Sequence, residues 1–451
     1  MSRAVRGNRR NLQQGHVVRF TKGEVVDGAD GRVMNRRGFV KRLAGAGAGV
    51  AVAGPLLNAA SARAATAIPL TVGVMVPTGS NYGLMGRSLV EGLSLGFDAG
   101  RTGAVPVSAT IVQHPVTRGY GDALGTAKSL LDSGSDVVVA GISSLVAQQI
   151  APLFAERQAP LIVTNVGAHV IPPNRRSPYV FYNSLLYWQA SYAMGRWAAA
   201  ALAKTGVSQQ AFVASALSDS GYDTVYAFRL GFESAGGTIV DERVTHVDPV
   251  DSGVSDLMNS VKSSGAKVLY GLYSGAHAAE FVQASASSGA KLAAGSLTVE
   301  DYMLPGLGSS AAGAYSCASW SATRSSPANL AFMKAFKARY RRTADPFAAL
   351  GYDTAVLIVQ GVRQAVQRRV GLRQFTSALS GFALEGPRGT LTLDPATNMV
   401  MSQLMIRQVK QTPSGLANVE VGKAPGVAPL GILAALGGAT PSGYINEYLC
   451  A

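Results

Sequence analysis

Hydroxyl groups and tyrosines gather in the turns that follow the apolar stretches of this sequence. Ser143 and Ser144 come soon after a run of three valines and an alanine, Tyr222 follows a Ser-Asp-Ser-Gly turn, and Tyr273 closes another apolar run. These turns nearly lack clusters of acids and bases, so their chemistry suits hydrogen bonding to a small polar ligand. Ser143 and Ser144 also open an expected helix, whose free backbone N–H groups favour a carboxylate, although serines are equally common there as plain N-caps.

Motifs for catalysis or metal binding are missing from the sequence. The histidines are His16, His114, His169, His246 and His277, and no two lie four apart as the helical zinc motif His-Glu-x-x-His requires. Only His169 lies beside a turn of the kind described above. There is no Gly-x-Ser-x-Gly elbow, Walker loop or Cys-x-x-Cys pair. We therefore expect no metal, no cofactor and no catalysis, and keep a hydrolase whose residues meet only on folding as the minor alternative.

The positive charge of the chain is concentrated at its beginning. The 451 residues include 40 Lys and Arg against 26 Asp and Glu, a formal charge of +14. Twelve of the basic and three of the acidic residues lie in 1–66, which leaves about +5 for the remainder. That balance is ordinary for a globular body, so it does not predict a nucleic-acid partner.

The basic beginning has the pattern of an export signal. The segment 35–41, Asn-Arg-Arg-Gly-Phe-Val-Lys, resembles the twin-arginine motif, and it precedes an apolar run at 43–57 that is too short to span a bilayer. Small-x-small cleavage sites follow at 62–64 and 65–67. We expect the twin-arginine translocase to export the chain to the periplasm, with Met34 as the start of translation. That compartment would permit a disulfide between Cys317 and Cys450, which the sequence leaves open.

Apolar strands alternate with helices along the body of the chain. The first series has strands at 70–76, 106–112, 136–140 and 160–164 and helices at 86–99, 121–133 and 143–155. After a helix at 187–204, a second series has strands at 210–216, 238–244 and 267–273 and helices at 223–235, 252–264 and 276–288. This alternation predicts parallel sheets covered on both faces, in two Rossmann-like α/β lobes. Ligands of such sheets bind beyond the carboxyl ends of the strands, where the polar turns lie.

In the order of these turns and elements the chain resembles the periplasmic substrate-binding proteins of the branched-chain amino acid (Leu/Ile/Val) type. The resemblance covers about residues 68–410. It is carried by the segments 74–79 (Val-Met-Val-Pro-Thr-Gly), 141–144 (Gly-Ile-Ser-Ser), 159–164 (Ala-Pro-Leu-Ile-Val-Thr), 351–355 (Gly-Tyr-Asp-Thr-Ala) and 385–394 (Glu-Gly-Pro-Arg-Gly-Thr-Leu-Thr-Leu-Asp).

The resemblance implies a type I periplasmic-binding-protein fold, in which a three-crossing hinge joins two lobes that close on a ligand. It places the first lobe at 68–186 and 321–381 and the second at 187–320 and 382–425, with a C-terminal extension at 426–451. It also implies delivery of the ligand to a membrane ABC permease complex. A sensing receptor component with the same fold is the alternative function.

The resemblance also implies a set of ligand-binding residues. The serine that holds the ligand carboxylate in the family falls on Leu145, with Ser143 and Ser144 just before it. The remaining positions are the turn Val166, Gly167, Ala168 and His169, the tyrosines Tyr222 and Tyr273, and Tyr82 and Trp188 as further aromatic candidates. Core packing is an equal alternative for Tyr82 and Trp188. The acid expected near 297 for a ligand ammonium is displaced, with Thr298 close by and Glu300 beyond it, which disfavours an α-amino acid.

Overall fold

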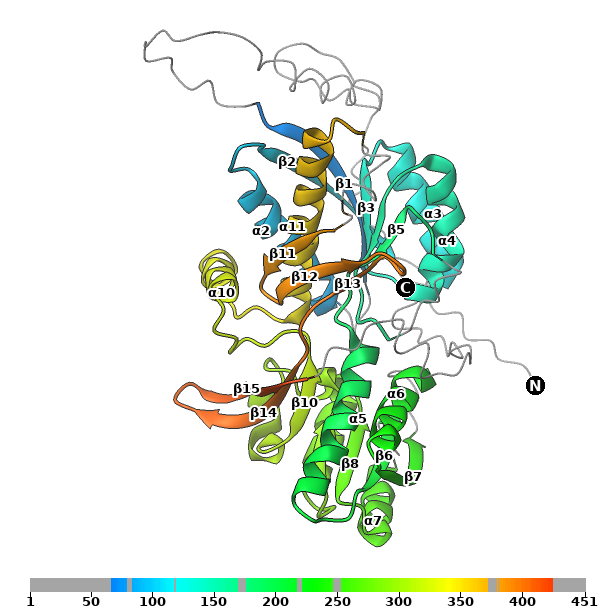
Figure 1. Ribbon diagram of the computed structural model, residues 1–451, viewed down its shortest axis with the longest axis vertical. Coiled ribbons are helices and arrows are strands. Elements are labelled where there is room, and N and C mark those ends of the chain that lie inside the picture. Colours follow the sequence, from blue (N-terminus) through cyan, green and yellow to red (C-terminus); the bar gives the residue numbers. More distant parts are fainter. Residues whose placement is uncertain are drawn as a thin grey trace, which may run out of the picture.

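The computed structural model describes residues 66–78, 83–116, 119–168, 176–216, 221–245, 253–371, 379 and 381–424. The export signal, Tyr82, His169, Cys450 and the extension 426–451 lie outside the described residues. Two α/β lobes, each built on one sheet, lie one above the other in Figure 1. Within the described residues, no helix combines the length and the apolar character needed to cross a membrane.

The first sheet has eight strands in the order β11-β12-β13-β5-β4-β3-β1-β2. They are β1 (Ile68–Pro77), β2 (Val107–Val116), β3 (Val137–Ala140), β4 (Leu161–Val163), β5 (Val180–Tyr182), β11 (Ala383–Gly386), β12 (Gly389–Asp394) and β13 (Met399–Met401). Pairing is parallel from β2 through β5 to β13, whereas β11 and β12 run antiparallel to their neighbours.

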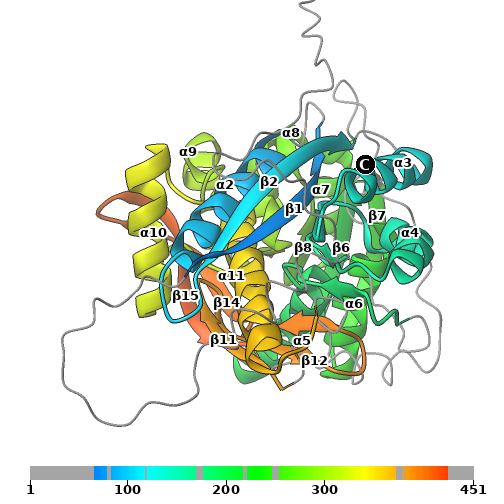
Figure 2. The ribbon, with the colours of Figure 1, turned by 90° about the horizontal axis from the view of Figure 1, so that it is seen from above.

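Helices cover both faces of this sheet. On one face Val72, Val74 and Ile162 pack with α2 (Gly83–Gly100) and α11 (Pro346–Gln367). On the other face lie α3 (Gly119–Asp132) and α4 (Ser144–Arg157), and Figure 2 shows the two helix pairs on opposite sides of the strands. The predicted covering of a parallel sheet on both faces is thereby confirmed for this lobe.

The second sheet has seven strands in the order β15-β14-β10-β9-β8-β6-β7. They are β6 (Gln210–Ala216), β7 (Thr238–Thr245), β8 (Val268–Leu272), β9 (Lys291–Ala294), β10 (Tyr315–Ala318), β14 (Met405–Thr412) and β15 (Gly415–Lys423). The core on one face includes α5 (Tyr187–Lys204) and α6 (Gly221–Ser234), and on the other α7 (Val254–Ser264) and α8 (Gly275–Ser285).

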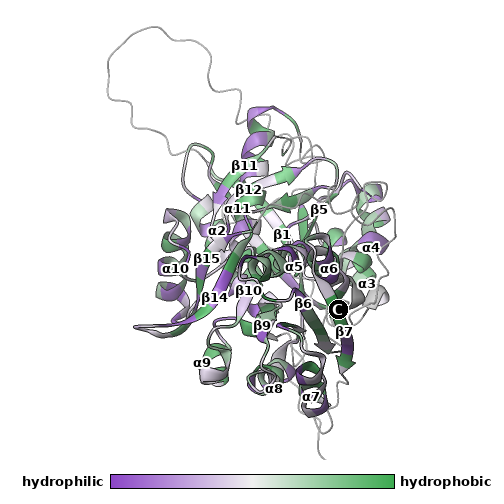
Figure 3. Ribbon diagram, turned by 60° about the horizontal axis from the view of Figure 1, so that its bottom comes forward, coloured by the Kyte–Doolittle hydropathy of each residue, from purple (hydrophilic) through white to green (hydrophobic). Residues whose placement is uncertain are grey.

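Four further helical elements complete the described part of the chain. They are the 3-10 helices η2 (Ser296–Val299) and η3 (Gly308–Ala311) and the helices α9 (Leu304–Leu307) and α10 (Pro327–Tyr340). Figure 3 shows that α3, α4 and α10 carry both hydrophilic and hydrophobic residues, and the buried residues of α10 are Asn329, Phe332 and Phe336.

The chain passes between the sheets three times. The first crossing joins β5 to α5, the second joins β10 to α10, and the third joins β13 to β14. The sequence prediction assigned 382–401 to the second lobe, but β11, β12 and β13 lie in the first sheet, because Met399 pairs with Tyr182 of β5. The partner of a short strand is chosen by contacts far away in sequence, so the local pattern did not reveal it.

Candidate functional site

The turn after β3 presents the N-terminus of α4. Ser143 is the N-cap of this helix, and its hydroxyl accepts a hydrogen bond from the Val146 N–H at 3.1 Å. Both Ser143 and Ser144 are buried, while Leu145 is half-buried and brings no polar side-chain group. The capping role considered for Ser143 is therefore present. In general, the N–H groups that the first turn of a helix leaves unbonded favour an anion.

Asn165, which the sequence prediction did not include, connects this turn to the next one. Its side-chain amide donates to the Ser144 hydroxyl at 3.0 Å and to the Ile142 carbonyl at 2.9 Å. The side-chain oxygen Oδ1 of Asn165 accepts a hydrogen bond from the Gly167 N–H at 2.9 Å. The usable signal was the residue type, because an asparagine at the start of a turn commonly bonds the backbone two residues on.

The turn 165–168 is also bonded to the start of α5. The carbonyls of Val166 and Gly167 accept from the N–H groups of Tyr187 and Trp188, each at 2.9 Å. Gly167 has a φ of +74°, and a Cβ at this position would collide with Ser184 Oγ. The predicted residues Val166, Gly167 and Ala168 thus form a buried, backbone-bonded turn that allows only glycine at its centre.

The aromatic candidates have different surroundings. Trp188 is buried and stacks on Tyr192 with a centroid separation of 5.9 Å, which is the geometry of core packing. Tyr222 lies in the first turn of α6, and its side chain is outside the described part. Tyr273 is buried, stacks on Phe281 at 4.1 Å and places its hydroxyl 3.2 Å from Thr245 Oγ1.

Thr298 lies beside Tyr273. Its hydroxyl accepts from the Tyr273 N–H at 3.1 Å and donates to the Gly271 carbonyl at 3.3 Å. These contacts tie η2 to the end of β8. The predicted residues therefore form two separate groups of contacts. One lies around Ser143 and the turn 165–168, and the other around Tyr273 and Thr298. Their part in ligand binding stays a prediction.

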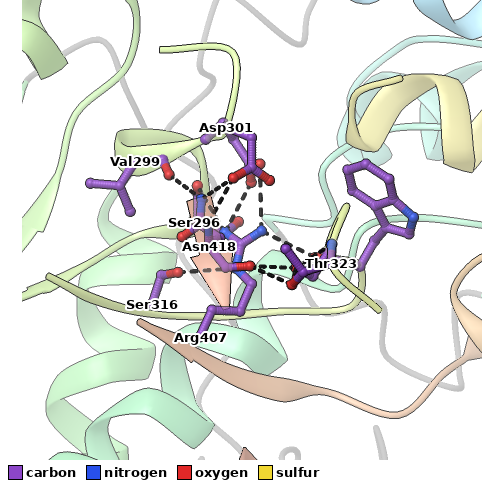
Figure 4. Close-up of polar contacts among 10 residues, drawn as sticks. Ser296, Val299, Asp301, Ser316, Thr323, Arg407 and Asn418 are labelled. Carbon is purple, nitrogen blue, oxygen red and sulfur yellow. Dashed lines mark hydrogen bonds and ion pairs between the residues drawn. The ribbon is translucent and has the colours of Figure 1, made fainter. Parts of the chain in front are cut away.

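Glu300 forms a buried ion pair with Arg407 of β14. The carboxylate oxygen Oε1 lies 3.1 Å from the guanidinium, and both side chains are essentially unexposed. Arg407 also donates to Ser316 Oγ at 3.1 Å and to the Trp320 carbonyl at 3.1 Å, and Figure 4 shows it in the middle of these contacts. Burial raises the pKa of Glu300 to about 7, and the charge of Arg407 opposes that rise.

Asp301, the neighbouring acid, is also hydrogen-bonded. Asp301 accepts from the backbone N–H of Asn418 at 2.8 Å, and the Asn418 side chain donates to the Val299 carbonyl at 2.7 Å (Figure 4). Of the two acids near position 297, Glu300 is therefore paired with a cation and Asp301 fixes β15. Within the described ranges, no group of three or more His, Cys, Asp or Glu side chains is arranged to hold a metal ion.

Comparisons with known proteins agree with this architecture. A sequence model of the periplasmic binding protein family matches residues 69–415. The curated relatives include Leu/Ile/Val-binding protein homolog 6 of Brucella melitensis, which is 25% identical over 372 residues, covering 79% of this chain and 91% of the relative.

Solved structures with the same fold include two ABC transporter proteins. The solute-binding protein from Rhodopseudomonas palustris BisB5, in complex with 3,4-dihydroxybenzoic acid, has a TM-score of 0.70 at 22% identity, covering 81% of this chain and 99% of that one. The substrate-binding protein from Sphaerobacter thermophilus has a TM-score of 0.72 at 22% identity, covering 79% and 98%. Together with the match over residues 69–415, the two-sheet fold with its three crossings establishes that the chain belongs to the periplasmic binding protein family.

Proposed function

We propose that this chain is the solute-binding component of an ABC importer and captures a small carboxylate between its two lobes. Membership of the periplasmic binding protein family and the ABC-transporter neighbours support the transport role. The N-terminus of α4, beside the turn 165–168, supplies the backbone N–H groups that suit a carboxylate. The function is binding without catalysis, and a bound ligand is released chemically unchanged.

The proposed ligand class rests on the ion pair between Glu300 and Arg407. An α-amino acid brings an ammonium group, and burying that charge requires an acid or several acceptors to compensate it. Glu300 is the acid nearest the expected position, and its charge is already balanced by Arg407. A carboxylate without an ammonium group avoids this cost. Benzoate and 4-hydroxybenzoate complexes among proteins of the same fold support an aromatic acid as the first candidate.

A branched-chain amino acid is the second candidate, because the curated relatives are named Leu/Ile/Val-binding protein homologs. A thermal-shift series with benzoate, 4-hydroxybenzoate, leucine, isoleucine and valine separates the two. A ligand at one hundred times its Kd stabilises the folded state by about 2.7 kcal/mol. We expect the benzoates to raise Tm. A rise with leucine alone would favour the second candidate, and turnover of any stabilising compound would reject the binding role.

The periplasm is the location that the family implies, and we propose the twin-arginine translocase as the export route because of the Arg36-Arg37 motif. Replacing both arginines by lysine should leave the chain in the cytoplasm. Cell fractionation followed by immunoblotting measures this, and undiminished export of the double variant would reject the route.

A further inference from the structure

Arg388 is a fully buried arginine in the turn between β11 and β12. Its guanidinium donates to Asp353 Oδ2 at 2.6 Å, to the Ser184 carbonyl at 2.6 Å and to the side-chain oxygen of Asn183. A Cβ at Gly386, two residues before, would collide with the Asp353 carboxylate, so the turn closes tightly over this pair. The planar guanidinium of Arg388 therefore donates hydrogen bonds to three different acceptors.

Two of the three groups that Arg388 binds, the Asn183 side chain and the Ser184 carbonyl, belong to the first crossing. Asn183 and Ser184 follow β5 directly, and the next residue, Leu185, donates its N–H to the Asn165 carbonyl at 3.0 Å. Ser184 Oγ lies against Gly167. Arg388 therefore fixes the chain that runs from the first sheet to α5, immediately behind the turn 165–168.

Arg407 has the corresponding place in the second lobe. It is fully buried, it is paired with Glu300, and it donates to the carbonyl of Trp320 in the second crossing at 3.1 Å. The two arrangements are connected, since Arg324, further along the second crossing, donates to the Arg388 carbonyl at 2.7 Å. Each lobe thus places one buried, acid-paired arginine on the backbone of a different crossing.

We propose that Arg388 and Arg407 are positioning residues that hold the first and second crossings and thereby set the angle between the two lobes. A buried pair of this kind gives little net stability compared with an apolar core, because both charges lose their hydration. The benefit of such a pair is that it fixes the direction of the chain to which the arginine is bonded. A guanidinium bonded to a carbonyl fixes where the chain leaves the sheet, and a small change there is magnified at the far ends of the lobes. This role does not depend on which ligand is captured.

The test measures the distance between the lobes in the full chain without added ligand. Nitroxide labels are placed on Ser129→Cys in α3 and Ser263→Cys in α7, both exposed positions, in a Cys450→Ser background that leaves only the buried Cys317. Pulsed electron resonance then gives the distance distribution. Arg388→Lys and Arg407→Lys keep the positive charge but lose the fork. Arg363→Lys is the matched control, because Arg363 bonds the carbonyls of Gly100, Thr102 and Val105 within the first lobe.

We expect Arg388→Lys and Arg407→Lys to broaden or shift the distribution, while Arg363→Lys leaves it unchanged. Unchanged distributions in both anchor variants, or an equal change in the control, would overturn the proposal. A change in only one of them would overturn the paired assignment. If a variant does not fold, hydrogen exchange of the parent decides. The Leu185 and Tyr187 amides should exchange as slowly as those of β3 and β4, and fast exchange through local opening would contradict a held crossing.

Discussion

Glu300 shows why residue type alone did not settle the ligand. The resemblance implied that Glu300 is a candidate for ligand binding. Its partner was not predictable, because Arg407 lies 107 residues later in the sequence. The same holds for Asp353 and Arg388, which are 35 residues apart. Ser143, in contrast, was predictable as a cap because its partner Val146 lies within the same helix turn. Partners within one helix turn can be inferred from spacing, whereas partners far apart in the sequence cannot.

The raised pKa of Glu300 predicts a pH dependence of stability. Its pKa is 4.5 in an ordinary setting and about 7 in the folded protein. Between these values the folded state holds a proton that the unfolded state has released. The free energy of unfolding contributed by this group therefore falls as pH rises from 4.5 to 7, by up to about 1.4 kcal/mol per pH unit.

Urea denaturation of the parent and of Glu300→Gln at several pH values between 4.5 and 7.5 isolates this contribution. The variant has lost the titrating group, so the difference between the two slopes is the quantity of interest. We expect the parent to lose stability with rising pH relative to the variant. Parallel slopes, or a relative gain by the parent, would show that Glu300 stays ionised across this range.

At the scale of elements, the turn 165–168 connects the starts of two helices, α4 and α5. Through Asn165 it bonds the start of α4, and through Val166 and Gly167 it bonds the start of α5. The helices were predictable from their apolar spacing, and so were β3 and β4 from their short apolar runs. The bonds between the turn and α5 were not, because they join the carboxyl end of a strand in one lobe to a helix of the other.

Gly167 and Gly134 form a matched pair for testing this turn. Both have positive φ, +74° and +93°, but a Cβ at Gly134 meets nothing within 4 Å, whereas at Gly167 it collides with Ser184. Gly134→Ala should cost about 1–2 kcal/mol of backbone strain. Gly167→Ala should cost the same strain and a further 1–3 kcal/mol, roughly, from overpacking. Thermal and urea unfolding measure both, and equal losses would show that the contact with Ser184 relaxes freely.

For the whole molecule, the two-lobe architecture was predictable and one of its boundaries was not. The alternation of strands and helices predicted two parallel sheets, and the strand pairing confirms two mostly parallel sheets, with antiparallel strands at β11, β12, β14 and β15. The strands β11, β12 and β13, at one end of the first sheet, were assigned to the wrong lobe because their short segments carry no local signal of the sheet they join. Their true place matters for function, since it brings Arg388 to the first crossing.

The proposed site takes a carboxylate without an ammonium group, and a ligand pair that differs only in that group distinguishes the two ligand classes. Leucine and 4-methylpentanoate share a carboxylate and an apolar chain. Calorimetric titration of the folded chain with each, with benzoate as a third ligand, gives three values of Kd. We predict that the acids lacking ammonium bind more tightly than leucine, by tenfold or more, about 1.4 kcal/mol. Tighter binding of leucine than of 4-methylpentanoate and benzoate would show that the site compensates an ammonium group, contrary to this prediction.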